Sequence, residues 1–147
     1  MNVMAQQELT LTRTFDAPRE LVWRAYTEPE QIARWWGPAG ITTPLETITV
    51  ELRPGGAYRL TMVDGDGNEY PADMTIRELV APERLVVGWD AQGGLGAGEV
   101  TIVLTELPGH RTRLESRFVG EGTPESMQMM EQGTKEQLDK LAALLAG

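Results

Sequence analysis

The sequence predicts an α+β domain in which one curved antiparallel sheet of about seven strands wraps around a long C-terminal helix. Between residues 47 and 119, runs of alternating apolar and polar residues are separated by turn residues, which is typical of antiparallel strands with one covered face. After residue 123 the apolar residues instead recur every three or four positions, as in an amphipathic helix. The expected order is strand, two short helices, six strands and a long helix.

The N-terminal third predicts the first strand and both short helices. Residues 8–15 alternate apolar and polar, so they form a half-buried strand. Pro18 suits the first turn of a helix because its missing N–H is not needed there. Residues 27–30 have the pattern of a capping box with a proline, which opens a second short helix, and Gly37-Pro38 ends it.

Six further strands follow, and alternation assigns their inner face. Residues 64–68, Asp-Gly-Asp-Gly-Asn, form a hairpin turn because these residue types tolerate positive φ. The inner-face positions are Ile48, Val50, Leu52, Tyr58, Leu60, Met62, Tyr70, Ala72, Met74, Ile76, Leu85, Val87, Trp89, Val100, Ile102, Leu104, Leu114, Ser116 and Phe118.

The C-terminal segment predicts the covering helix. Thr123 is a favourable N-cap and Pro124 a favourable first-turn residue. From residue 124 to 146 the helix is roughly 35 Å long at 1.5 Å per residue. Its apolar stripe is Met127, Met130, Thr134, Leu138, Leu141 and Leu145.

Length and composition limit the organisation and the chemistry. The 147 residues, 41% of them hydrophobic and 24% charged, suit one globular domain, which we place at residues 8–146 after an N-terminal extension of residues 1–7. The absence of cysteine excludes disulfides and thiolate chemistry. A net charge of −9 disfavours nucleic acid. Neither a secretory signal nor a membrane-spanning run is visible, so we expect a cytoplasmic location and no membrane partner.

The sequence resembles the SRPBCC (START-like, helix-grip) superfamily, in the branch named for the activator of the ninety-kilodalton heat-shock protein's ATPase. The resemblance covers roughly residues 8–146 and implies a helix-grip fold with a cavity between sheet and long helix, but no particular reaction. Members often have Gly-Trp where this chain has Gly133-Thr134. The matching motifs are 15–18, Val22-Trp23, 27–30, 35–38, 53–56, 82–85 and 138–141.

The candidate site is this cavity. Its polar members could hydrogen-bond a ligand or could be satisfied core groups. The adjacent Trp35 and Trp36 point about 100° apart on a helix, so one anchors the core and the other lies nearer the surface. The expected ligand-binding residues are Trp35, Tyr58, Met62, Tyr70, Met74, Trp89, Ile102, Ser116, Phe118, Met127, Met130, Thr134 and Leu138.

Other motifs predict no catalytic residue, metal site or cofactor. The turn at 64–68 lacks the glycine and glutamate positions of a calcium loop. The glycine-rich run 93–98 lacks a phosphate-loop ending and is a flexible connection that could act as a lid. His110, the only histidine, falls in an exposed turn, and Glu69 and Asp73 face water.

Three functions are therefore considered. The first is binding of a small apolar or aromatic molecule in the cavity. The second is a protein-interaction or co-chaperone-like module, with a protein partner or as a homodimer. The third is an enzyme of the cyclase, hydratase or hydrolase kind, which needs positioned acid–base groups that the inner face lacks. The residues favour binding over catalysis.

Overall fold

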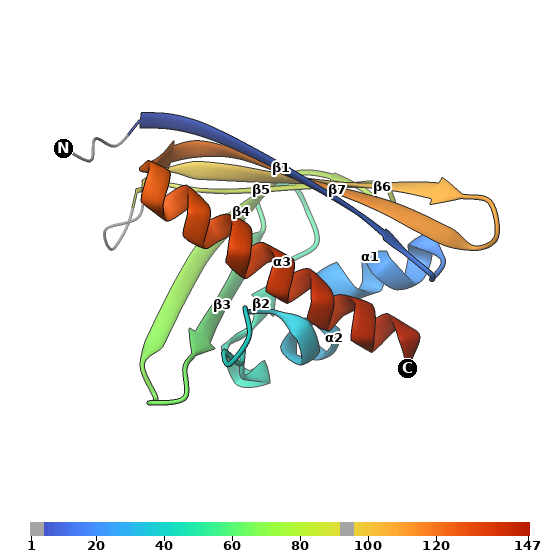
Figure 1. The fold of residues 1–147 in the computed structure, drawn as a ribbon, viewed down its shortest axis with the longest axis horizontal. Helices are drawn as coiled ribbons and strands as arrows, with labels where there is room; N and C mark the ends of the chain where they lie inside the picture. The colour runs from blue at the N-terminus through green and yellow to red at the C-terminus, as the bar shows by residue number, and fades with distance from the viewer. Residues whose placement is uncertain (1–4, 92–95) are drawn as a thin grey trace.

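The computed structural model describes residues 5–91 and 96–147 and shows a seven-stranded antiparallel sheet bent around one long helix (Figure 1). The spatial order of the strands is β1-β7-β6-β5-β4-β3-β2. The predicted fold class and element order are confirmed, with one added 3₁₀ turn. The elements are β1 (Ala5–Phe15), α1 (Arg19–Thr27), α2 (Pro29–Trp35), η1 (Leu45–Thr47), β2 (Thr49–Val50), β3 (Ala57–Val63), β4 (Glu69–Val80), β5 (Arg84–Trp89), β6 (Gly98–Leu107), β7 (Arg111–Gly122) and α3 (Pro124–Ala146).

The helices all lie on the concave side of the sheet. In Figure 1, β1, β7, β6 and β5 form an upper layer, and β3 and β4 bend away from it. Helix α3 crosses the concave side diagonally, and its C-terminal end lies near α1 and α2. The main core is therefore built between the sheet, α1, α2 and the end of α3.

Strand pairing defines which residues share the concave face. Residues directly opposite each other in an antiparallel pair lie on the same face. Tyr58 is opposite Met74, and Val100 is opposite Phe118. Val87 is opposite both Ile76 and Val100, so alternation along the chain places the predicted inner-face positions of β3 to β7 on one concave face.

The N-terminal cap of α3 agrees with the prediction. Thr123 Oγ1 accepts a hydrogen bond from the Ser126 N–H at 3.1 Å, and Ser126 Oγ accepts one from the Thr123 N–H at 2.9 Å. This reciprocal pair satisfies two backbone donors at the helix end. Among the described residues, no helix is long and apolar enough to cross a membrane.

The predicted capping box at residues 27–30 is wrong. The N-cap of α2 is Glu28, and it makes no side-chain cap hydrogen bond. The Thr27 hydroxyl instead donates to the Trp23 carbonyl at 2.9 Å, because Thr27 is still the last residue of α1 and is buried.

Two strand boundaries also differ from expectation. Strand β1 begins at Ala5, which pairs with Gly122, so residues 5–7 belong to the sheet and not to an extension. Strand β2 is short because the chain turns directly after it, and Leu52 is 50% exposed. The turn is tight at Gly56, where an added Cβ would lie 2.1 Å from the Glu51 carbonyl oxygen.

Candidate ligand-binding site

Helix α3 is buried at one end only. Its buried residues are Leu138 and Leu141, 3% and 0% exposed, and both lie in its C-terminal half. None of the residues from 124 to 137 is buried, although Met127, Met130 and Thr134 are half-buried. The N-terminal half of α3 therefore covers the sheet less completely than the C-terminal half.

Side-chain burial is also uneven across the concave face of the sheet. Leu104 and Leu114 are almost fully buried beneath the helices. Apolar side chains elsewhere on the face remain half-exposed although they pack against the core. We call these half-exposed residues, together with Met127, Met130 and Thr134 of α3, the open end of the concave face. Its sheet members are Met62, Ala72, Trp89 and Val100.

Trp89 and Phe118 form the aromatic part of this region. Their ring centroids lie 5.9 Å apart with an interplanar angle of 22°, which is a stacked arrangement. Trp89 Nε1 donates to the Gly96 carbonyl at 2.9 Å, so the indole orientation is fixed by a hydrogen bond. Trp89 keeps part of its surface exposed, while Phe118 is buried.

As expected, one of the adjacent tryptophans is buried in the core and the other is nearer the surface. The buried one is Trp35, which the sequence analysis had placed among the ligand-binding residues. Trp35 is 0% exposed, and its Nε1 donates to the Ala25 carbonyl at 2.8 Å. Trp36 is half-buried, 5.4 Å from Trp35 and 5.9 Å from Tyr58 between ring centroids. Trp35 is therefore a core anchor, and Trp36 is the member with accessible surface.

Several other expected site residues also lie in the core. Tyr58 is 1% exposed, and its hydroxyl donates to the Tyr26 carbonyl at 2.5 Å. Burial raises the pKa of Tyr58 well above its ordinary value, with a smaller contribution from Tyr26. Met74, Ile102 and Leu138 are 7%, 5% and 3% exposed. These residues are part of the buried core and not of the half-exposed surface.

Tyr70 lies at the tip of the β3–β4 hairpin and is 47% exposed. Its hydroxyl donates to Asp64 Oδ2 at 2.8 Å. That hydrogen bond raises the pKa of Tyr70 above its ordinary value. Tyr70 shares a face with Met62, its cross-strand partner, but its polar group is used by the turn.

Two of the expected site residues keep a hydroxyl group that could meet a ligand. Ser116 and Thr134 are both half-buried, and neither side chain makes a hydrogen bond within the described part of the chain. A half-buried hydroxyl can donate to or accept from water or a bound polar group. They are the polar groups that could orient an otherwise apolar ligand.

A polar cluster that the sequence did not predict fastens α3 to the loop after α2. Lys140 Nζ donates to the carbonyl oxygens of Gly37 and Ile41 at 3.0 and 2.9 Å. Gln137 and Glu136 accept from the N–H groups of Gly37 and Ala39, each at 3.1 Å. Desolvation lowers the pKa of Lys140. These bonds hold the C-terminal half of α3 in place next to the open end.

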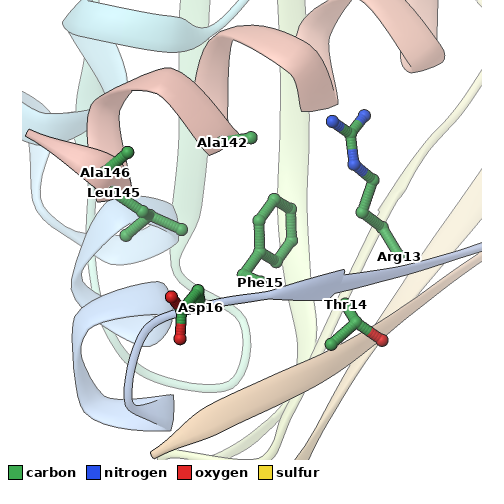
Figure 2. A pocket seen from close by; sticks show the side chains of 7 residues that line it. All are labelled: Arg13, Thr14, Phe15, Asp16, Ala142, Leu145 and Ala146. Carbon is green, nitrogen blue, oxygen red and sulfur yellow. The ribbon is translucent and has the colours of Figure 1, made fainter.

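Of the residues expected to bind a ligand, only Trp89 lines either of two surface hollows in the described part of the structure. The first, of about 340 Å³, lies where the end of β1 meets the C-terminal end of α3, and Figure 2 shows the Phe15 ring directed toward that helix. Arg13, in its wall, forms an ion pair with Asp139. The second, of about 210 Å³, includes Trp89, Gly98 and Gly120 together with outer-face residues such as Arg77 and Glu99.

The remaining motifs are structural where they are described. Asp64 Oδ1 accepts from the N–H groups of Asp66 and Asn68 at 2.9 and 3.0 Å, as a turn residue does. His110 lies in an exposed turn with φ of +56°. Residues 92–95 of the glycine-rich run, which was considered as a lid, lie outside the described residues. Within the described ranges no group of three or more His, Asp or Glu could hold a metal ion.

Comparison with known proteins identifies the family. The sequence model described as Activator of Hsp90 ATPase homolog 1-like protein matches residues 16–146. The chain belongs to this family. The family resemblance that the sequence motifs indicated is therefore confirmed. The helix-grip fold is the fold that this resemblance implied. No curated protein matches the sequence.

Solved structures agree with the family assignment. A protein from Chromobacterium violaceum is 28% identical with a TM-score of 0.80, covering 95% of this chain and 97% of that chain. A protein from Nitrosomonas europaea is 26% identical, also with a TM-score of 0.80, covering 95% and 94%. The AHSA1 protein from Silicibacter pomeroyi is 25% identical with a TM-score of 0.81, covering 95% and 98%.

Proposed function

We propose that this AHSA1-like protein binds a small apolar or aromatic molecule at the open end of the concave face. The observation that carries the proposal is the uneven burial of α3, whose buried residues all lie in its C-terminal half. Half-exposed apolar side chains therefore remain on the concave face of the sheet and on the N-terminal half of α3. A ligand there gains the burial that the protein itself leaves incomplete.

The size of this gain is adequate for specific binding. Covering about 200 Å² of apolar surface at about 25 cal/mol per Å² contributes about 5 kcal/mol. Met62, Met127 and Met130 are unbranched and polarizable, so they can adjust to the shape of a ligand. The hydroxyls of Ser116 and Thr134 supply hydrogen bonds that orient it.

The test is a fluorescence titration with N-phenyl-1-naphthylamine, an uncharged apolar probe. Saturable binding that stabilises the folded protein is expected, by about 2.7 kcal/mol at 100 times the dissociation constant. Absence of saturable binding by this probe and by a panel of aliphatic and aromatic probes would refute the proposal.

The variant Thr134→Trp locates the binding region. A ring at this half-buried position fills space between α3 and the sheet, so we expect a higher melting temperature and weaker probe binding together. The matched control is Ala143→Trp, an exposed position on the same helix, which should leave the affinity unchanged. If Thr134→Trp lowers stability and leaves probe affinity intact, the site lies elsewhere.

A protein partner or homodimer is the second candidate, and it rests on the family description and on exposed apolar residues. Leu45 and Leu52, at 47% and 50% exposed, lie on either side of β2, an edge strand. Sedimentation of the purified protein tests self-association, and a doubled mass that Leu52→Glu returns to the monomer would support it. Single exposed leucines are common on protein surfaces, so this candidate ranks second.

A further inference from the structure

The aromatic pair at the open end is built on glycines. Gly98 of β6 lies opposite both Trp89 of β5 and Gly120 of β7. A Cβ placed on Gly98 would lie 2.6 Å from Trp89 Cζ2 and 2.8 Å from Phe118 Cε1. A Cβ on Gly120 would lie 2.8 Å from Phe118 Cζ. A side chain at Gly98 would force both rings to move, and one at Gly120 would also clash with the Ala97 carbonyl oxygen at 2.6 Å. The two glycines therefore let both rings lie close to the backbone of the sheet.

This arrangement places both rings close to the sheet backbone on its concave face. The two rings are nearly parallel, at 22°, and meet over Gly98. The hydrogen bond from Trp89 Nε1 to the Gly96 carbonyl stops the indole from rotating freely. Trp89 is half-buried, so part of its surface is accessible to a ligand.

On the concave side, the described sheet neighbours of the rings are uncharged, whereas the charged residues that share a hollow with Trp89, Arg77 and Glu99, belong to the outer face. Met127 Sδ lies 3.3 Å from the position of a Cβ on Gly122, two residues beyond Gly120 on the same face of β7. The thioether therefore lies over the glycine-rich end of β7. Among the described inner-face neighbours of the rings, Val100, Gly98 and Gly120 are uncharged. An ionised ligand would lose its hydration here without gaining a counter-charge.

We infer that the open end selects planar, uncharged aromatic molecules, which stack on Trp89 where Gly98 lets its ring lie close to the sheet. This inference rests on the proposed function and narrows it from apolar molecules in general to one class. Stacked aromatic rings attract each other beyond the burial of their area, whereas a puckered aliphatic skeleton cannot lie flat on the indole.

The experiment compares 2-naphthol with decahydro-2-naphthol, which has the same carbon skeleton and hydroxyl group but saturated rings. Isothermal titration calorimetry of the wild-type protein should show about two- to tenfold tighter binding of 2-naphthol. Trp89→Leu retains apolar area and removes the stacking surface, so it should abolish this preference. Gly98→Ala should also abolish it, because the added methyl displaces both rings.

Gly65→Ala is the matched control, since nothing lies within 4 Å of a Cβ at that position, and it should retain the wild-type preference. If Gly98→Ala fails to fold, Trp89→Leu still decides the matter. Equal wild-type affinity for the two compounds, or an equal loss of both in Trp89→Leu, would overturn the inference and leave the proposed function standing. Absence of binding by either compound would overturn the inference, and the broader probe panel would then decide the proposed function separately.

Discussion

The ammonium group of Lys140 donates a hydrogen bond to the carbonyl oxygen of Gly37 at 3.0 Å, across 103 positions of the chain. A second bond to Ile41 makes this lysine the tie between α3 and the loop that follows α2. One end of α3 is thereby fixed, while the half nearer its N-terminus lies less deeply buried over the open end.

Replacement of this lysine should destabilise the fold. Lys140→Met keeps most of the aliphatic chain but leaves two carbonyl oxygens without their donor, which should cost about 1–3 kcal/mol of unfolding free energy. Lys135→Met is the control, because Lys135 is paired with Glu131 on the exposed face of α3 and should change stability by less than about 0.5 kcal/mol. Urea unfolding measures the unfolding free energy of both variants. Equal losses would show that the two hydrogen bonds of Lys140 add no measurable stability.

The two adjacent tryptophans should differ sharply in stability measurements. Trp35→Phe removes a donor to the Ala25 carbonyl and leaves a void in a fully buried position, so it should cost about 2–4 kcal/mol. Trp36→Phe changes a half-buried ring and should cost about 1 kcal/mol or less. Thermal unfolding of both variants compares them directly. A larger loss for Trp36→Phe would contradict the assignment of Trp35 as the core anchor.

Acid should weaken the β3–β4 hairpin through Asp64. Hydrogen bonds from Asn68 and Tyr70 lower the pKa of Asp64 from 3.8 to about 2. Because the folded pKa is depressed, the stabilisation is complete above the ordinary value and is lost as the pH falls through about 2. Carboxyl NMR should give this midpoint, and Tyr70→Phe should raise the pKa toward 3.8. An unchanged pKa in Tyr70→Phe would rule out the proposed hydrogen bond.

Much of the fold could be predicted because each strand is half-buried and therefore alternates. The alternation at Tyr58, Met62 and Met74 assigned the face that the pairing then showed. The N-cap at Thr123 was equally local, since it depends on a bond only three residues along the chain. Local patterns misled at residues 27–30, where two helices follow each other directly and Thr27 still belongs to the first.

The site was less predictable because it depends on distances between segments far apart in the chain. The sequence indicated a flexible connection for 93–98, whereas Gly98 pairs with Gly120 and contacts two rings. Nothing local distinguishes Lys140 from an exposed helical lysine. Its partners are loop carbonyls about 100 residues away, and such partners leave no periodic signal in the sequence.

The most direct test of ligand binding at the open end is a methionine-methyl NMR titration with N-phenyl-1-naphthylamine. Met129 lies on the same helix but is 76% exposed, so it serves as an internal control. We expect the methyl signals of Met62, Met127 and Met130 to shift together with one dissociation constant while that of Met129 stays in place. No shift in any of the three signals, or an equal shift of Met129, would contradict binding at the open end.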